Sequence, residues 1–149
     1  PSGGDRVAEL RREMTTTMEE GAGIYRTQAS LEQTYRTLTD LRERFERVDL
    51  DDRTNVYNTD LTTTLALGHM LDVALALAAS ARDRTESRGS HQRSDFPERD
   101  DNNFLTHSLA FLEPNGAPRM DYRNVVITKW PPGSRTYGMD EDSKTSLTS

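Results

Sequence analysis

The sequence contains no cysteine, and this absence excludes disulfide bonds, thiolate nucleophiles and cysteine-based metal sites. It also lacks an excess of positive charge, since 19 Lys and Arg residues stand against 25 Asp and Glu residues, for a net charge of −6. The basic residues alternate with acids and form no run, which argues against binding to nucleic acid. The sequence shows no signal peptide or lipidation motif.

Apolar residues are also scarce: 33% of the 149 residues are hydrophobic and 30% are charged. A chain of this length can form one domain with a modest core. So polar a composition predicts an elongated domain, or a domain that completes its core against a partner. The sequence opens with PSGGD and not with Met, and we expect the chain to be cut from a longer protein.

Two amphipathic helices are predicted in the first third of the chain. The first ends at the glycines of EEGAG, and its apolar residues are Val7, Leu10, Met14 and Met18. The second carries a longer apolar stripe, made of Leu31, Tyr35, Leu38, Leu41, Phe45 and Val48. Ser30 and Gln33 are expected to form a capping box at its start.

The opposite face of the second helix is expected to be solvated. It carries acids that each stand four residues before an arginine, in the pairs Glu32–Arg36, Asp40–Arg44 and Glu43–Arg47. This orientation is favourable in a helix, but each such pair contributes only about 0.2–0.5 kcal/mol. The pairs therefore indicate a solvated surface and no catalytic site.

The segment from Leu65 to Ala81 is far more apolar, and its only polar side chains are His69, Asp72 and Ser80. Its interruptions and its alanine content argue against a membrane span, which requires roughly twenty predominantly apolar residues. A helix that is apolar on nearly all sides is covered on several faces. We therefore predict a mainly α fold, a three-helix bundle of the spectrin-repeat type with this helix at its centre. Its uncovered apolar face is expected to dock against another domain.

A charged loop and a small β-hairpin with an extended tail are predicted after this helix. Residues 106–127 alternate with period two and are expected to form two strands. Their connection contains Asn115 and Gly116 between Pro114 and Pro118, which makes it longer than a two-residue turn. The expected organisation is a three-helix bundle over residues 1–90, a charged loop and hairpin over 91–137, and a flexible acidic tail over 138–149.

Two candidate sites in the helical part are weak. The stretch from Gly21 to Arg26 begins like a dinucleotide-binding fingerprint, but it follows a helix, and Arg26 stands where the last glycine or alanine belongs. We favour a glycine-terminated helix instead. His69 and Asp72 share one helical face, and a hydrogen-bonded pair at a packing interface is favoured over a metal site because no third ligand lies near in sequence.

Two candidates in the later part are also weak. His107 lies beside Ser108 in the strand pattern, but nothing nearby indicates an activated nucleophile. Trp130 precedes two prolines, and it is either an interaction anchor or a residue at the end of a strand.

The charged stretch Glu86–Asp101 follows directly after the most apolar helix. A buried charge must be paired and hydrogen-bonded, so buried clusters contain both signs in a fixed geometry. The residues that carry this pattern are Glu86, Arg88, His91 and Arg93, with Gly89 permitting a sharp turn among them. Their placement favours an interface network, and a solvated loop is the alternative.

The chain contains the motifs MEEGAGIYRT, LRERFERV, NTDLTTTLALGHMLDVA, ESRGSHQR, DFPERDDNNFLTHSLAF and YRNVVITKWPPGSRTYG. In this order they resemble the carboxy-terminal region of the flavoprotein subunit of fumarate reductase and succinate dehydrogenase. The resemblance extends from about Val7 to Gly138, and it is closer to the quinol–fumarate reductase branch because PERDDNNFLTHSLAF and PPGSRTYG follow that pattern. L-Aspartate oxidase, a relative, shares the ESRG element and the following histidine but not the hairpin and tail.

The resemblance implies a helical domain that follows the flavin-binding and capping domains of an FAD-dependent enzyme interconverting fumarate and succinate. In that family the dinucleotide-binding glycines, the histidine joined to flavin and the dicarboxylate-binding residues lie upstream, and no matching motif occurs here. We therefore expect no catalytic, cofactor-binding or metal-binding residue in this chain, and no activity of the chain in isolation. Glu86, Arg88, His91 and Arg93 are interpreted as packing support.

The resemblance also implies partners and a location. The partners are the upstream flavin-binding domain of the same subunit, an iron–sulfur subunit and a flavin-attachment factor, with no nucleic acid and no direct membrane insertion. The location is cytoplasmic and peripheral to the inner membrane, as part of a complex. Two other hypotheses stay open: the corresponding domain of L-aspartate oxidase, and a free-standing helical interaction module.

Overall fold

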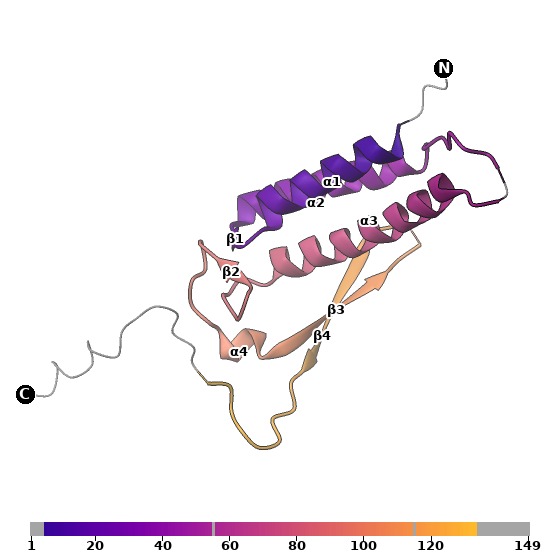
Figure 1. Cartoon of the computed structure of the whole chain (residues 1–149). Helices are drawn as coiled ribbons and strands as arrows, with labels where there is room; N and C mark the ends of the chain where they lie inside the picture. Colours follow the sequence, from indigo (N-terminus) through magenta and orange to yellow (C-terminus); the bar gives the residue numbers. More distant parts are fainter. Residues whose placement is uncertain (1–4, 55, 115, 134–149) are drawn as a thin grey trace, which may run out of the picture.

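The computed structural model describes residues 5–54, 56–114 and 116–133, and shows a helix-rich chain with a small antiparallel hairpin (Figure 1). The helices are α1 (Val7–Ala22), α2 (Gln28–Phe45), α3 (Thr59–Asp83) and the short α4 (Asp101–Phe104). The strands are β1 (Tyr25–Arg26), β2 (Gln92–Arg93), β3 (Thr106–Leu112) and β4 (Pro118–Asn124). The predicted helix-rich class with a hairpin is confirmed. The acidic tail predicted over 138–149 lies outside the described residues.

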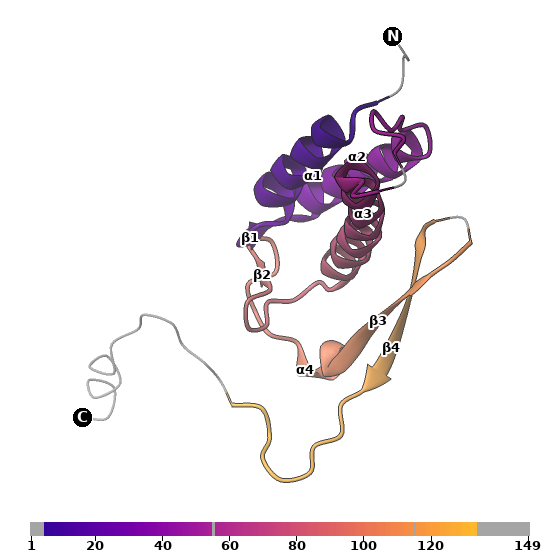
Figure 2. The ribbon, with the colours of Figure 1, turned by 45° about the vertical axis from the view of Figure 1, so that its right-hand side comes forward.

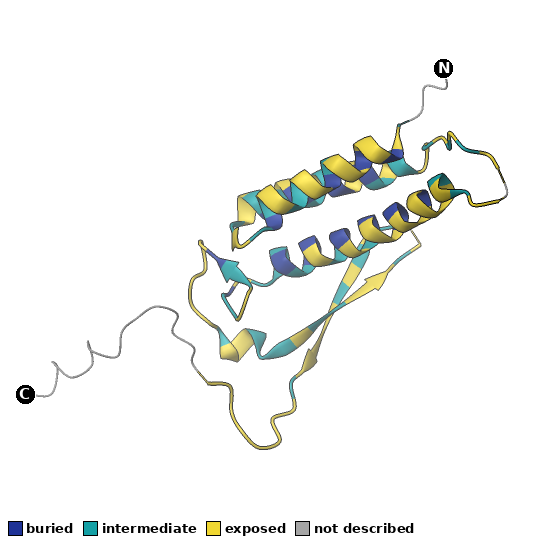
Figure 3. Cartoon of the chain, in the orientation of Figure 1, coloured by how far each residue is buried: buried dark blue, intermediate teal, exposed yellow. Residues whose placement is uncertain are grey.

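The three long helices lie side by side and share an apolar core, which Figure 3 shows as the buried strip along their facing sides. Its buried members are Val7, Leu10, Met14, Leu38, Leu41, Leu67, Leu71, Ala74, Leu75 and Ala78. Small residues on α3 let α2 approach closely, since a Cβ added at Gly68 would lie 3.0 Å from the ring of Phe45. The predicted stripe residues form or border this core, except Leu31, which packs in a second buried cluster with Ala22 and Ala81.

The capping box of α2 lies three residues earlier than the sequence predicted. Thr27 is the N-cap: its side-chain oxygen accepts from the N–H of Ser30 at 3.1 Å, and Ser30 Oγ accepts from the N–H of Thr27 at 3.0 Å. The predicted Ser30–Gln33 box is therefore wrong. Ser30 occupies the third helical position, where a Glu or Gln side chain usually accepts a hydrogen bond from the N–H of the N-cap residue. Here the Ser30 hydroxyl accepts that bond. Two of the predicted surface ion pairs on α2, Glu32–Arg36 and Asp40–Arg44, are formed.

Helix α3 is buried on the side facing α1 and α2 and carries exposed apolar residues elsewhere (Figure 3). Leu65 is 56% exposed, Val73 67% and Leu77 41%, so the predicted uncovered apolar face is present. By length and composition alone α3 could cross a membrane, a test that the core helix of a soluble protein also passes. Its partial burial against α1 and α2 fits a core helix.

The hairpin lies on the side of α3 opposite α1 and α2 (Figure 2). β3 and β4 are antiparallel in a register that pairs Thr106 with Asn124 and Leu112 with Pro118. Residues 113–117 connect them, and Gly116 has φ +79°, a conformation that favours glycine. The prediction of a connection longer than a two-residue turn is confirmed.

The sequence did not predict the parallel pair of β1 and β2. Tyr25 pairs with Gln92 and Arg26 with Arg93, which joins segments more than sixty residues apart in the chain. Strands of two residues carry no detectable periodicity, so only the tertiary structure can bring them together.

Candidate functional site

The candidate residues gather at one end of the helical part, where α1 ends, α2 begins and α3 ends (Figure 1). Helix starts leave N–H groups without partners, and helix ends leave carbonyl groups without partners. The aligned peptide dipoles favour anions at the starts and cations at the ends. We call this region the helix-end junction; it consists of Arg26, Gln28, Arg84, Glu86, Arg88, His91, Arg93, Asp95, Asp100 and Asp101.

Arg93 caps the C-terminal end of α3 and is buried, with 1% of the residue exposed. Its Nη1 donates to the main-chain oxygens of Ala81, Arg82 and Arg84 at 3.2, 3.2 and 3.3 Å. The guanidinium also forms two parallel bonds with Asp95, Nε to Oδ1 at 2.8 Å and Nη2 to Oδ2 at 2.9 Å. A buried cation is tolerated here because it is paired and its donors are used.

Asp95 accepts a hydrogen bond at the start of α2, just as Arg93 donates hydrogen bonds at the end of α3. Its Oδ2 accepts from the N–H of Gln28, the first residue of α2, at 2.7 Å. The hydrogen bonds from Arg93 hold the pKa of the Asp95 carboxyl well below its ordinary value. One ion pair therefore joins the end of α3 to the start of α2, with each charge at the helix terminus that favours it.

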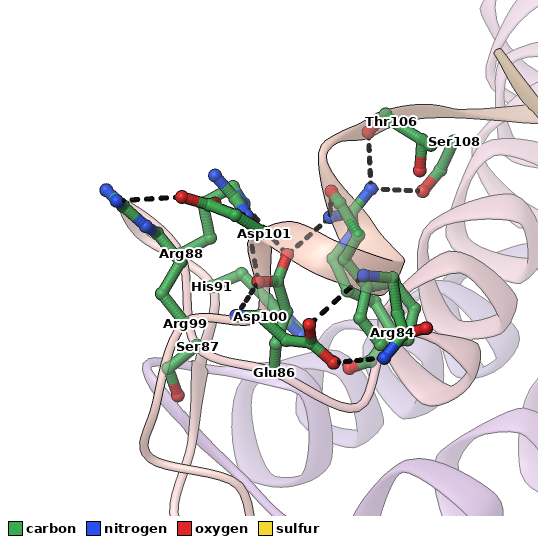
Figure 4. Close-up of polar contacts among 12 residues, drawn as sticks. Arg84, Glu86, Ser87, Arg88, His91, Arg99, Asp100, Asp101, Thr106 and Ser108 are labelled. Atoms are coloured by element: carbon green, nitrogen blue, oxygen red, sulfur yellow. Dashed lines mark hydrogen bonds and ion pairs between the residues drawn. The ribbon is translucent and has the colours of Figure 1, made fainter. Parts of the chain in front are cut away.

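Glu86 is the acidic centre of the second half of the junction and is 0% exposed (Figure 4). Its carboxylate accepts from Arg84 Nη1 at 2.5 Å, from Arg88 Nε and Nη2 at 2.8 and 3.0 Å, and from the N–H of Asp100 at 2.8 Å. Burial acts to raise the pKa of this carboxyl, but Arg88, the Asp100 N–H and Arg84 outweigh it and the net effect is a lowered pKa. Glu86 is thus ionised and fully hydrogen-bonded.

Arg84, the C-cap of α3, connects Glu86 to the hairpin (Figure 4). Its guanidinium donates to the main-chain oxygens of Phe104 and Thr106 at 2.8 and 2.7 Å and to Ser108 Oγ at 3.1 Å. These contacts attach α4 and the start of β3 to the end of α3. The orientation of the hairpin is therefore determined in part by one arginine.

Arg88 lies nearer the surface. Its Nη2 bonds Asp101 Oδ1 at 2.6 Å, and its main chain forms two hydrogen bonds with His91 around Gly89, which has φ +59°. The hydrogen bond from Arg88 lowers the pKa of Asp101, which also pairs with Arg99 at 2.9 Å. The turn predicted at Gly89 is present.

His91 contacts α1 through Arg26. Arg26 Nη1 lies 2.8 Å from His91 Nδ1, while His91 Nε2 lies 3.1 Å from the main-chain oxygen of Arg84. The same Arg26 side chain donates through Nε to the oxygens of Ala22 and Gly23, at 3.1 and 2.8 Å, and so closes the end of α1. Burial is the largest influence on the pKa of His91 and lowers it. The hydrogen bond with the Arg84 carbonyl acts to raise this pKa, but Arg26 and the other nearby arginines lower it, and the net effect is a lowered pKa.

The structure brings all four sequence candidates, Glu86, Arg88, His91 and Arg93, into this junction. Sequence reasoning missed the partners that complete it, which are Arg26, Gln28, Arg84, Asp95, Asp100 and Asp101. Arg84 and Asp95 lie next to or within the charged stretch, so its charge density was a usable signal for them. No local signal identifies Arg26, which reaches His91 only through the pairing of β1 with β2.

The remaining candidates in the helical part are the His69–Asp72 pair and the glycine stretch that begins at Gly21. The preferred hydrogen bond between His69 and Asp72 is wrong: Asp72 instead accepts from Arg42 Nε of α2 at 3.0 Å, and His69 is exposed. Asp72 thus pairs with an arginine of the neighbouring helix and not with His69. Gly21 lies inside α1, where a Cβ would stand 1.9 Å from Thr34 Oγ1 of α2, so it permits close packing of the two helices.

Among the described residues, the candidates in the later part of the chain have no neighbouring groups that could activate them for catalysis. His107 is exposed on β3, and Ser108 Oγ accepts from Arg84. Trp130 is 78% exposed, and the Lys129 ammonium lies 5.5 Å from the centroid of its ring.

Within the described ranges no group of three or more His, Asp or Glu side chains is placed to hold a metal ion. The buried charges of the junction, Glu86 and Arg93, are paired with groups of the same chain, and this arrangement suits the joining of helix ends.

Comparison with known proteins shows that the chain is similar to part of the fumarate reductase flavoprotein subunits. A model of the family described as "Fumarate reductase flavoprotein C-term" matches residues 11–137. The fumarate reductase flavoprotein subunits of a Serratia species and of Haemophilus influenzae are 52% and 49% identical to it, each over 95% of this chain and 24% of the relative. A solved mutant of E. coli quinol fumarate reductase aligns with a TM-score of 0.87 and 49% identity, over 93% of this chain and 24% of that chain. The chain thus spans about a quarter of the length of these relatives.

Proposed function

Since the chain belongs to the family of fumarate reductase flavoprotein C-terminal domains, we propose that it serves an FAD-dependent fumarate reductase as a packing and docking domain. In this role FAD and the residues that act on fumarate belong to the preceding part of the subunit. The cofactor carries the hydride chemistry and the protein orients it. The present domain stiffens the flavin-binding part and contributes no residue to the reaction.

The observation that carries this proposal, besides the family, is that the buried charges of the helix-end junction are paired within the chain. The buried Glu86 and Arg93 bind groups of their own chain on every side described above. A substrate carboxylate would have to displace Glu86 or Asp95 from arginines that hold them at 2.5–3.0 Å. Such a closed network supports a structural task.

The proposal includes an internal division of the chain. The three long helices act as a bundle of the spectrin-repeat type over residues 1–90, and residues 91–137 add the charged loop and hairpin. An acidic tail over 138–149 completes it. The shared core of α1, α2 and α3 supports the first unit, and the attachment of α4 and β3 through Arg84 supports the second.

The uncovered side of α3 is the surface we assign to docking. Met70, Val73 and Leu77 follow each other at helical spacing and are 39%, 67% and 41% exposed. Val73 also borders a shallow groove against the hairpin, whose other apolar lining includes Phe111 and Leu112. Contiguous exposed apolar surface usually marks an interaction site. We assign this α3 face to the flavin-binding part of the same subunit.

The remaining partners belong to the same proposal. An iron–sulfur subunit delivers electrons to the flavin, and a flavin-attachment factor contacts the subunit during its maturation. The complex lies on the cytoplasmic side, peripheral to the inner membrane. These assignments are supported by the family to which the chain belongs.

The test uses the full-length subunit with Val73→Asp on the α3 face. We expect lower flavin content and weaker assembly with the iron–sulfur subunit, because a charge would be buried without a partner. Thr39→Asp, at an exposed position of α2, is the matched control and should retain both. Both changes should leave the melting temperature of the 149-residue chain nearly unaltered. A Val73→Asp subunit with full flavin content and normal assembly would refute the docking assignment.

A further inference from the structure

His91 occupies a position at which three chain segments meet. It is half-buried between β1, which carries Arg26, and the end of α3, which presents the main-chain oxygen of Arg84. β2 begins at the next residue and pairs with β1. The two ring nitrogens of one side chain therefore join the segment after α1 to the segment after α3.

The partners of the ring require a neutral imidazole with its proton on Nε2. The Arg84 oxygen can only accept, so Nε2 must donate to it across 3.1 Å. Arginine has donors and no acceptor, so Nδ1 must accept from Arg26 across 2.8 Å. A second proton on the ring would convert Nδ1 into a donor facing another donor.

The charges around His91 add to this conflict. The charged groups that act on it from the packed elements are Arg26 on β1, Arg93 on β2 and Arg84 at the end of α3, and all three are cations. The acids of the junction are already engaged: Glu86 pairs with Arg84, Asp95 with Arg93 and Asp101 with Arg88. Asp100 accepts hydrogen bonds from the N–H groups of Asn102 and Asn103 and from the Asn103 side chain. No carboxylate in this set is free to compensate an imidazolium.

We propose that the Arg26–His91 contact is an acid-released latch that closes the pairing of β1 with β2. At neutral pH the latch holds the end of α1 against the end of α3. Protonation of His91 breaks the bond to Arg26 and places two cations 2.8 Å apart. The pairing next to it, in which the N–H of Ser94 donates to the oxygen of Arg26 at 2.9 Å, then opens.

The pH range follows from the direction of the shift. The pKa of His91 in the folded chain lies below its ordinary value of 6.5, so the unfolded chain binds the proton more readily. The contribution of His91 to stability is complete above about pH 6.5 and is lost as the pH falls through the folded pKa. The ordinary pKa values of Asp and Glu, 3.8 and 4.5, lie lower. The range between about pH 5 and 7 therefore reports on histidine.

The first experiment measures the latch directly in the 149-residue chain. Nitrogen NMR of the imidazole should show the Nε2–H tautomer at neutral pH and a titration midpoint below 6.5. Arg26→Gln keeps a donor for Nδ1 but removes the cation, and it should move this midpoint upward. A His91 that carries its proton on Nδ1, or that titrates above 6.5, overturns the proposal.

The second experiment follows the opening. The amide of Ser94 should lose protection from hydrogen exchange between about pH 7 and 5, after correction for intrinsic exchange, and the urea midpoint should fall over the same range. His91→Gln can both donate and accept but cannot titrate, so it should abolish both pH effects. His69→Gln, at an exposed histidine of α3, is the matched control and should retain them. Equal pH dependence in His91→Gln and the unaltered chain overturns the latch.

Discussion

Replacing Arg93 with methionine should destabilise the chain far more than replacing an arginine at the surface. Methionine keeps much of the apolar stem in a site that is 1% exposed, so the change chiefly removes the guanidinium. The loss comprises three bonds to the last carbonyls of α3, two bonds to Asp95 and one bond to the Gln28 side chain. The Ala81 and Arg82 carbonyls then have no other described partner at this helix end, whereas the Arg84 carbonyl keeps its hydrogen bond with His91 Nε2.

The expected magnitude follows from the chemistry of the pair. Removing one partner of a buried ion pair costs about 3–5 kcal/mol, because the remaining charge and its hydrogen-bonding groups are left without compensation. The Asp95 side chain is 29% exposed and can recover part of its hydration. We therefore expect a loss near the lower limit, about 3 kcal/mol of the free energy of unfolding.

Urea denaturation of the 149-residue chain measures this loss, and Arg119→Met is the matched control. Arg119 pairs with Glu113 at 2.9 Å, but the two side chains are 54% and 40% exposed, and such a pair contributes about 0–1 kcal/mol. An equal loss in the two variants would show that the Arg93 network does not stabilise the helix ends. The interpretation of the junction as a support would then be refuted.

Three further predictions concern the junction and the proposed function. The purified chain should show no absorption from bound flavin, since the flavin site is assigned to the preceding part of the subunit; a stoichiometric yellow chromophore would contradict this. Arg88→Ala in the full-length subunit should lower its melting temperature while leaving fumarate affinity intact, because Arg88 binds Glu86 and Asp101 of its own chain; lost fumarate binding with unchanged melting would make Arg88 a substrate ligand. The free energy of unfolding should fall in acid, because Glu86 and Asp95 have lower pKa values in the folded chain than in the unfolded chain. The stability that these two carboxylates contribute is complete above their ordinary pKa values of 4.5 and 3.8, and it is lost as the pH falls through their folded pKa values. Urea midpoints from about pH 5 downward check this, with Glu86→Gln expected to flatten the acid slope.

The sequence by itself determined the elements with strong periodicity and the family. The stripes of α1 and α2, the apolar α3 and the alternation of β3 and β4 are local patterns, and each is read from residues a few positions apart. The charge density of residues 86–101 likewise indicated a paired network at the end of α3. Family motifs span most of the chain, so the assignment needed no coordinates.

Only the tertiary structure decided which partners those residues take. Asp72 lies three residues from His69 but binds Arg42, which is thirty residues distant. The N-cap of α2 is Thr27, three residues before the predicted Ser30. Arg26 and His91 lie 65 residues apart in the chain and carry no shared signal. The physical reason is that periodicity reports which face of an element is buried, whereas a hydrogen bond depends on where a second element places its donors. That placement is fixed by the packing of α1, α2 and α3 as a whole.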